Sequence, residues 1–290
     1  MGLRLKFNLM LLAVALAGML LFELASTPIL QNLATDEVLQ SSRIMMESAL
    51  GARKYTSEQV APLLEPEMQT TFRPQAVSAY AAKKNFDVLR ATYPDYVYRE
   101  AALNPTNLED RATDWEADVI NDFRSHPEKK EIVLRRETPT GLTLNLARPL
   151  TAKPACLVCH STPAVAPPSM IAIYGVQNGF GWHAGDIIGA QIVSVPMGLA
   201  QARADRVRML FLVPYLVVFA MLFVLLNLLL DLMVIGPISR MAKTAEAVSL
   251  GQMDAPEYVR GGADQIARLS RAINLMRRSL EEALRMLTNG

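Results

Sequence analysis

The chain has 290 residues, and its 29 Lys and Arg residues nearly balance its 28 Asp and Glu residues, which leaves a formal net charge of +1. A nucleic-acid-binding protein usually carries a clear basic excess, so this balance argues against that function. Apolar residues make up 51% of the chain and charged residues only 20%, which favours membrane segments over disorder. Two cysteines are too few for a disulfide-stapled scaffold.

Two apolar runs predict membrane-spanning helices. The first extends from Phe7 to about Pro28 and follows the basic residues Arg4 and Lys6. A basic start, an apolar stretch and small residues near Ala25 also fit a cleaved secretory signal, and the sequence leaves that alternative open. The second run, Met209–Leu230, contains no charged residue and is long enough to cross a hydrocarbon core of about 30 Å.

These runs predict four parts, which are an N-terminal transmembrane anchor at 1–28, a domain at 29–208, a second transmembrane helix at 209–232 and a C-terminal tail at 233–290. The basic residues before the first run favour a cytoplasmic N-terminus. Two membrane spans then place the tail in the cytoplasm as well and the domain between the spans outside it.

A five-residue motif carries the strongest chemical information in the chain. Residues 156–160 read Cys-Leu-Val-Cys-His, the C-x-x-C-H pattern that attaches c-type heme. Cys156 and Cys159 would form thioethers with the two vinyl groups, and His160 would be the proximal iron ligand. A zinc site would need further ligands, and the chain has no second Cys pair. The sequence therefore predicts heme c, whose covalent attachment outside the cytoplasm agrees with the predicted topology.

The segment around this motif is expected to be an α+β domain, with helices followed by an antiparallel sheet. In the first helix the apolar positions are Leu33, Val38, Ile44, Met45 and Leu50, and in the last helix Trp115, Val119 and Phe123 share one face. Periodicity predicts helices at 33–52, at 56–64, at 74–91 and from an Asn107 cap to 123, and strands at 132–136, 142–149, 170–176 and 187–195. The heme motif would lie between the second and third of these strands.

Four segments together resemble one known family. They are Arg53-Lys54-Tyr55-Thr56, Asn104-Pro105-Thr106-Asn107, the heme motif and Gly181-Trp182-His183-Ala184-Gly185-Asp186-Ile187-Ile188-Gly189-Ala190. Over roughly residues 35–197 the chain resembles the PAS-like c-type heme sensor family. That resemblance implies a PAS-like periplasmic domain of a bacterial inner-membrane receptor, which senses redox state or a small gas. Some members use a cysteine as the second axial ligand, and the absence of a third cysteine here excludes that ligand.

The distal iron ligand is therefore a separate question. Similar heme domains take a ligand from the helices before the sheet, so we favour Met68. Met46 and His183 remain alternatives, and an open or exchangeable position would suit gas sensing.

The C-terminal tail resembles a HAMP module. One helix carries Ile238, Met241, Ala245 and Val248. After a connector from Gly251 to Gly262, a second helix carries a heptad series, which consists of Ile266, Leu269, Ile273, Met276, Leu280, Ala283 and Leu287. Asp264-Gln265-Ile266 replaces the usual Asp-Glu-Ile of that family. The resemblance implies a parallel four-helix bundle from two chains, hence a homodimer, whereas a membrane-surface helix is the alternative.

Together these features predict a membrane-bound heme-c sensor that couples heme redox state or small-ligand binding to a HAMP signal relay. The chain would act on an unknown cytoplasmic output protein in trans. A membrane-anchored c-type cytochrome for electron transfer is the alternative, although an electron carrier has no use for a HAMP-like tail. We expect no enzymatic activity, because the sequence shows no nucleophile–base arrangement, phosphate loop or metal cluster.

Overall fold

The computed structural model describes residues 2–252 and 256–288, with side chains of the last helix as far as Met286. The chain divides into two compact units. Residues 22–208 form one of them, which we call the α+β domain. The residues before 22 together with those from 209 onward form the other, which we call the helical unit. Each unit is described by itself.

Helix α1 extends without a break from Leu3 to Tyr55, although Pro28 lies inside it. The sequence predicted two separate helices here. In the α+β domain the buried residues of α1 recur at three- and four-residue spacing and are small or slender, so the helix lies close to the sheet: Ala34, Val38, Ser42, Met46 and Ala49. The predicted core positions Leu33 and Ile44 are wrong, since both are exposed. A π-helical turn, Thr56–Val60, and helix α2, Ala61–Met68, follow.

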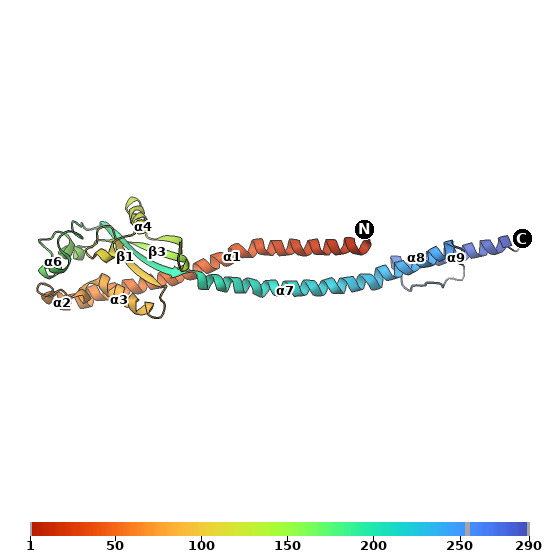
Figure 1. The fold of residues 1–290 in the computed structure, drawn as a ribbon, viewed down its shortest axis with the longest axis horizontal. Helices are drawn as coiled ribbons and strands as arrows, with labels where there is room; N and C mark the ends of the chain where they lie inside the picture. Colours follow the sequence, from red (N-terminus) through yellow and green to blue (C-terminus); the bar gives the residue numbers. More distant parts are fainter. Residues whose placement is uncertain (1, 253–255, 289–290) are drawn as a thin grey trace. The chain divides into compact units, whose positions relative to one another are not determined.

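Four antiparallel strands form one sheet in the order β1-β4-β3-β2 (Figure 1). Their bounds are Val97–Ala102 for β1, Ile132–Thr138 for β2, Gly141–Thr151 for β3 and Ile187–Pro196 for β4. The predictions of β2, β3 and β4 are confirmed. Because β4 lies between β1 and β3, the segment that connects β3 to β4 brings the heme motif to one end of the two central strands.

Two strand assignments differ from the prediction. The predicted strand at 170–176 is wrong, because Pro168–Tyr174 forms helix α6. Pro167 and Pro168 start this helix, and Gly175, with φ of 74°, ends it. Strand β1 was not predicted, because charged Arg99 and Glu100 interrupt its apolar pattern. In the folded chain each of them faces an oppositely charged partner, so the sheet tolerates both.

Helices cover both faces of the sheet (Figure 1). Helix α1 and helix α3, Ser78–Arg90, pack on one face, and helix α4, Asp114–Ser125, packs on the other. The core on the α1 side includes Met46, Phe86, Tyr98, Leu144 and Val193. The core on the α4 side includes Val119, Ile120, Phe123, Ala147 and Ile192. The sheet is therefore the middle of three layers.

The start of α4 corrects a predicted cap. Asn107 caps only a 3-10 turn, Leu108–Asp110, by accepting the N–H of Glu109 at 3.2 Å. Thr113 precedes α4 and forms a reciprocal capping box with Glu116, whose carboxylate accepts the Thr113 N–H at 2.8 Å. The predicted apolar face of this helix is confirmed, since Trp115, Val119 and Phe123 belong to one core cluster.

In the helical unit, two apolar helices are long enough to cross a membrane. The second is helix α7, Gly198–Leu230. The Tyr215 hydroxyl of α7 donates to the Ala15 carbonyl of α1 at 2.8 Å, and a Cβ at Gly18 would lie 2.7 Å from the Tyr215 oxygen. Arg4, near the start of α1, forms an ion pair with Asp231, which directly follows the last residue of α7. The two spans therefore pack antiparallel, and the chain is a membrane protein.

A second π-helical turn, Asp231–Ile235, joins α7 to helix α8, Gly236–Ser249. The Gly236 N–H donates to the Asp231 carbonyl, which closes the wide turn. A Cβ at Gly236 would lie 2.9 Å from that same oxygen, so glycine permits the close approach. Met241 and Val248 of α8 are buried, as the predicted pattern requires.

Helix α9, Gln265–Thr288, buries a different face from the one its heptads predict. Ala267, Ser270 and Asn274 are buried, and the last two hydrogen-bond the Tyr258 carbonyl of the connector at 2.5 and 3.0 Å. Apolar heptad residues are left in solvent, with exposed fractions of 45% for Leu269, 50% for Met276 and 43% for Leu280. The side chain of Leu287 and connector residues 253–255 lie outside the described residues.

Candidate heme site

The Cys-x-x-Cys-His motif lies on one short helical stretch between β3 and β4. A 3-10 turn, Pro154–Cys156, leads into helix α5, Leu157–His160. The two cysteines are partly exposed and are not joined by a disulfide. Burial raises the pKa of the Cys159 thiol, and the nearby Cys156 raises it further. Both sulfurs are therefore available as thiols on a single turn of backbone.

The His160 imidazole is held by three residues that are distant in sequence. Its Nδ1 lies 2.8 Å from the Gly179 carbonyl oxygen and 3.3 Å from the Thr106 hydroxyl. Because a carbonyl only accepts, the proton is on Nδ1 and the lone pair is on Nε2. Burial lowers the pKa of His160 and outweighs the opposite effect of the Gly179 hydrogen bond. The Trp182 ring stacks on the imidazole at 4.0 Å between centroids and 15° between planes.

The loop before β4 encloses the motif. Gly179 has φ of 81°, and a Cβ there would overlap Thr106. The Trp182 N–H donates to the His160 carbonyl at 3.3 Å, and the Gly181 N–H donates to the Ser161 carbonyl at 3.0 Å. Three of the four segments that carry the family resemblance therefore meet here. The roles of Gly179 and Trp182 were not predicted, although Trp182 belonged to a quoted segment.

The fourth segment contributes a charged network on the α1 side of the sheet. Arg53, near the end of α1, forms an ion pair with Glu100 of β1, and both side chains are largely buried. The Tyr98 hydroxyl donates to Glu100 at 2.6 Å and accepts from the Gln191 amide at 2.9 Å. Burial raises the pKa of Tyr98, so it stays protonated. Burial alone would lower the pKa of Arg53, but Glu100, with smaller contributions that include Cys156, raises it.

The three distal-ligand candidates occupy different surroundings. Met68 ends α2, where its sulfur accepts the Arg73 N–H at 3.2 Å and its carbonyl accepts the Ser169 hydroxyl of α6. Met68 thus lies beside the segment that follows the heme motif. Met46 is fully buried in the α1-side core. The His183 side chain is 84% exposed, with Nδ1 3.3 Å from Asp186. Which of them ligates iron stays a prediction.

A hollow of about 520 Å³ lies beside Trp182. Its lining is mixed, because it combines apolar Leu103, Phe180, Trp182, Ile187 and Ile188 with polar or charged Asn104, Arg124 and Asp186. Two free thiols and an imidazole with an available Nε2 fit heme c by the chemistry of these donors.

Family models match two parts of the chain. The family described as Tll0287-like matches residues 31–196, and the HAMP domain matches residues 232–282, which confirms the predicted HAMP module. The crystal structure of the cyanobacterial heme protein Tll0287 aligns with a TM-score of 0.45 and 18% identity, covering 55% of this chain and 95% of that one. No match to a curated protein was found. Because the family match spans more than half of the chain and confirms the predicted resemblance, the protein belongs to the Tll0287-like family.

Proposed function

We propose that the protein is a membrane-bound sensor in which heme c, attached to Cys156 and Cys159, controls the HAMP domain of a homodimer. The observation that carries this proposal is the His160 imidazole. Its Nδ1 proton is fixed on the Gly179 carbonyl, which leaves Nε2 as a neutral ligand beside two thiols.

When bound, heme c would supply a one-electron redox centre whose sixth position takes a protein or exogenous ligand. The chain's own residues would hold and shield it. His160 would bind iron through Nε2, while Trp182 restricts rotation of the ring and excludes water from one of its faces. Met68 is the proposed distal ligand, with Met46 and His183 as the alternatives.

Contacts of the heme-bearing segment support a relay toward both membrane helices. Arg53 belongs to α1 and pairs with Glu100 of β1, the strand beside β4. Strand β4 follows the loop that holds His160, and it ends at Pro196, two residues before α7 begins. A rearrangement at the motif would therefore act on α7 through the chain itself, and on α1 through β4, β1 and the Arg53–Glu100 ion pair.

The exposed heptad residues of α9 support the proposed homodimer. A stripe with Leu269, Met276 and Leu280 in solvent is what a two-chain bundle would cover. We further propose that residues 29–208 are periplasmic in a bacterial inner membrane, with 1–28 and 209–232 as the spans and 233–290 cytoplasmic. A cytoplasmic output protein would then receive the signal in trans.

The Tll0287-like domain followed by a HAMP domain points to a non-enzymatic signalling protein. The alternative, a membrane-anchored c-type cytochrome for electron transfer, accounts for the heme motif and the membrane helices but gives the HAMP domain no role. The sensor is therefore the better supported of the two functions.

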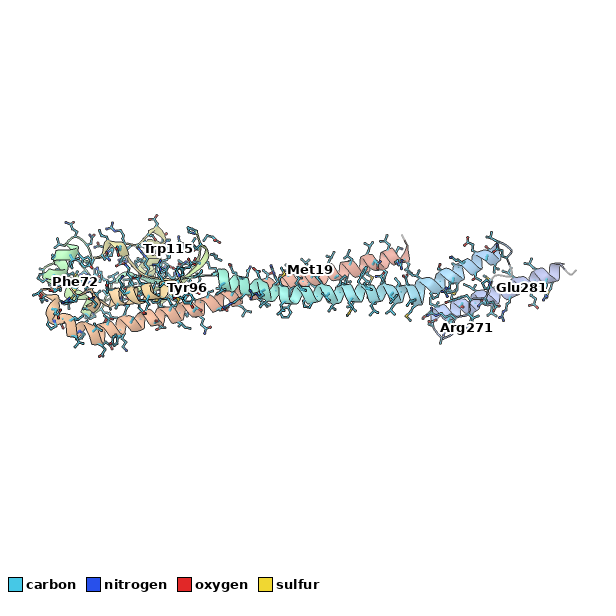
Figure 2. The ribbon with its side chains drawn as sticks, turned by 60° about the horizontal axis from the view of Figure 1, so that its bottom comes forward. Met19, Phe72, Tyr96, Trp115, Arg271 and Glu281 are labelled. Carbon is cyan, nitrogen blue, oxygen red and sulfur yellow. The ribbon has the colours of Figure 1, made fainter. Side chains whose placement is uncertain are left out.

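The decisive experiment asks whether heme state reaches α9. Ile273→Cys places a thiol on the heptad face, and Arg271→Cys places one on a neighbouring exposed position of the same helix (Figure 2). In membranes, Ile273→Cys should crosslink to a second copy at a rate that differs between oxidised and reduced heme. Arg271→Cys should crosslink slowly in both states.

Crosslinking at residue 273 that ignores the redox state and added carbon monoxide would retain the dimer but contradict the sensor and favour electron transfer. If neither variant crosslinks, the parallel bundle is contradicted, and a helix that lies on the membrane surface becomes the better account of α9.

A further inference from the structure

A second hollow lies on the α4 face of the sheet and has a volume of about 280 Å³. It is built on the first residues of β1 and the last residues of β4, where Val97 pairs with Ser194. The heme motif connects to the other end of β4, at Ile187. At about 3.3 Å per residue, Ile187 and Ser194 lie roughly 23 Å apart along the strand. The charged network around Arg53 is on the opposite face, so this pocket is distinct from the candidate heme site.

Polar residues of the strands line this pocket. A sheet face that is covered by a helix is ordinarily apolar, so these residues are unusual. Asn145 is only 3% exposed and Thr143 only 7%. The Ser194 hydroxyl donates to Asn145 Oδ1 at 2.7 Å, and Asn145 Nδ2 donates to the Thr143 carbonyl at 3.3 Å. These bonds orient the amide but leave its second N–H available to a ligand. Buried, oriented polar groups that line a hollow are a common feature of small-molecule sites.

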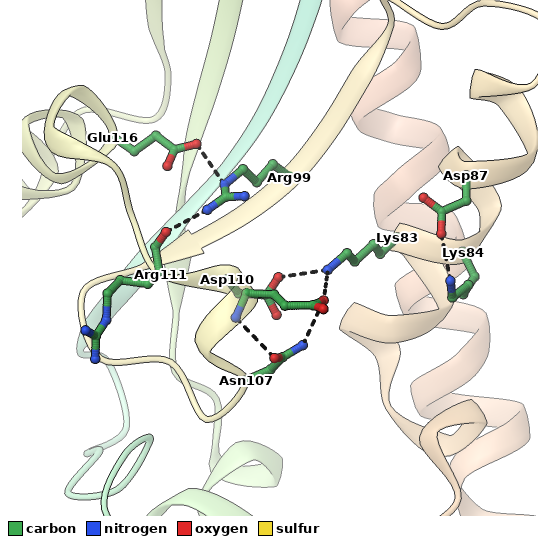
Figure 3. Close-up of polar contacts among 9 residues, drawn as sticks. Lys83, Lys84, Asp87, Arg99, Asn107, Asp110, Arg111 and Glu116 are labelled. Carbon is green, nitrogen blue, oxygen red and sulfur yellow. Dashed lines mark hydrogen bonds and ion pairs between the residues drawn. The ribbon is translucent and has the colours of Figure 1, made fainter.

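Two arginines and two carboxylates, Glu116 and Asp95, line the pocket, and among the described residues only Arg99 forms an ion pair with one of these carboxylates. Arg99 Nε lies 2.9 Å from Glu116 Oε1, and its Nη2 donates to the Arg111 carbonyl at 2.6 Å (Figure 3). Arg99 is therefore neutralised and fixed. The Arg136 guanidinium lies over the Trp115 ring at 4.1 Å from its centroid. Within 2–252 and 256–288, no carboxylate forms an ion pair with Arg136, so its charge is available to a ligand.

We propose that this pocket binds a small molecule that carries a carboxylate, with that carboxylate on Arg136. The flat guanidinium, held by stacking on Trp115, presents two parallel N–H groups that match a carboxylate. Asn145 and Ser194 would hydrogen-bond the remainder of the ligand. A water molecule takes about 30 Å³, so the pocket holds on the order of ten non-hydrogen atoms. This site would give the sensor a second input that does not require heme.

The test uses the purified full-length protein and the tryptophan fluorescence of Trp115. Acetate, succinate and citrate are titrated beside acetamide and succinamide, which resemble the first two but carry no charge. At least one carboxylate should change the emission saturably, and the amides should not. Trp115→Phe should remove the signal, because the chain has only one other tryptophan. Replacing Cys156 and Cys159 with serine should leave the titration unchanged.

The adjacent arginines of β2 provide a matched pair. Arg136→Gln should weaken carboxylate binding at least tenfold, while Arg136→Lys should weaken it less. Arg135→Gln should leave it unchanged, because Arg135 faces the other side of the sheet and donates to Thr35 of α1 at 2.8 Å. The proposal is overturned if none of the three acids gives a saturable change. It is equally overturned if the two glutamine variants weaken binding alike, or if binding disappears together with the heme.

Discussion

The α+β domain and helix α9 differ in how far they bury their apolar side chains. The domain encloses two apolar cores within a single chain, and Phe123, Ile120 and Leu144 are all fully buried. Helix α9 instead leaves Leu269, Met276 and Leu280 about half exposed. A single chain therefore completes the core of the domain, whereas the proposed HAMP bundle would need a second chain. Stability of the first should not depend on protein concentration, and stability of the second should depend on it.

The largest effect is expected from replacing both motif cysteines with serine. Covalent heme should be lost completely, because a thioether cannot form without a thiol. Both cysteines are partly exposed and lie outside the two core clusters, so the domain should still fold. A pyridine-hemochrome assay after acid–acetone extraction measures the bound heme. Heme that survives extraction in the double variant would contradict the assignment.

The self-contained core can be tested with Phe123→Ala. Removing this fully buried ring should lower the free energy of unfolding of the α+β domain by about 3–5 kcal/mol. The matched control is Leu108→Ala, which removes an exposed side chain and should change stability by less than about 0.5 kcal/mol. Urea unfolding at two protein concentrations provides the measurement. A midpoint that shifts with concentration would show that the domain also depends on a second chain.

The incomplete bundle can be tested with two neighbouring leucine-sized residues of α9. Met276 and Leu275 are both exposed in the single chain, but only Met276 lies on the heptad face. Met276→Asp would place a carboxylate in the dimer core and should raise the dimer dissociation constant at least tenfold, about 1.4 kcal/mol. Leu275→Asp should have little effect. Analytical ultracentrifugation in detergent separates the outcomes, and equal weakening by both variants would rule out the proposed interface.

Met68→Ala is expected to change stability little, because Met68 is partly exposed and lies outside both cores. This variant tests whether Met68 of the same chain supplies the distal iron ligand. If Met68 is the distal ligand, heme content should stay constant while the absorption spectrum changes and carbon monoxide binds faster. An unchanged spectrum would exclude Met68 and direct attention to Met46, His183 or an open position.

The sequence predicted the covalent chemistry of the site because Cys156, Cys159 and His160 lie within five residues. It did not reveal what orients the imidazole. Gly179 is 19 residues from His160, and Thr106 is 54 residues away in the other direction. Contacts at such separations leave no periodicity or spacing that a local pattern could show, although two of the quoted family segments contained Thr106 and Trp182.

Secondary structure was predicted correctly where one face of an element is apolar. The prediction was wrong where charged residues or prolines determine the element. Strand β1 was missed because Arg99 and Glu100 look solvent-exposed until Glu116 and Arg53 are placed beside them. Helix α6 was read as a strand because its isoleucines suggested one. The HAMP module was recognised correctly, yet the single chain buries Ser270 and Asn274 of α9 and not its heptad face, because the Tyr258 carbonyl of the connector accepts hydrogen bonds from both.

The wide turn between α7 and α8 has a mechanical consequence. A π-turn contains one residue more than an α-turn. It therefore rotates the side chains of the helix that follows by about one residue, roughly 100°, about the helix axis. Contraction of Asp231–Ile235 to ordinary α geometry would turn α8 about its own axis by a similar angle. Gly236 permits the π-turn, because it has no Cβ to meet the Asp231 carbonyl. The geometry of this single turn therefore determines which face of α8 meets its neighbours.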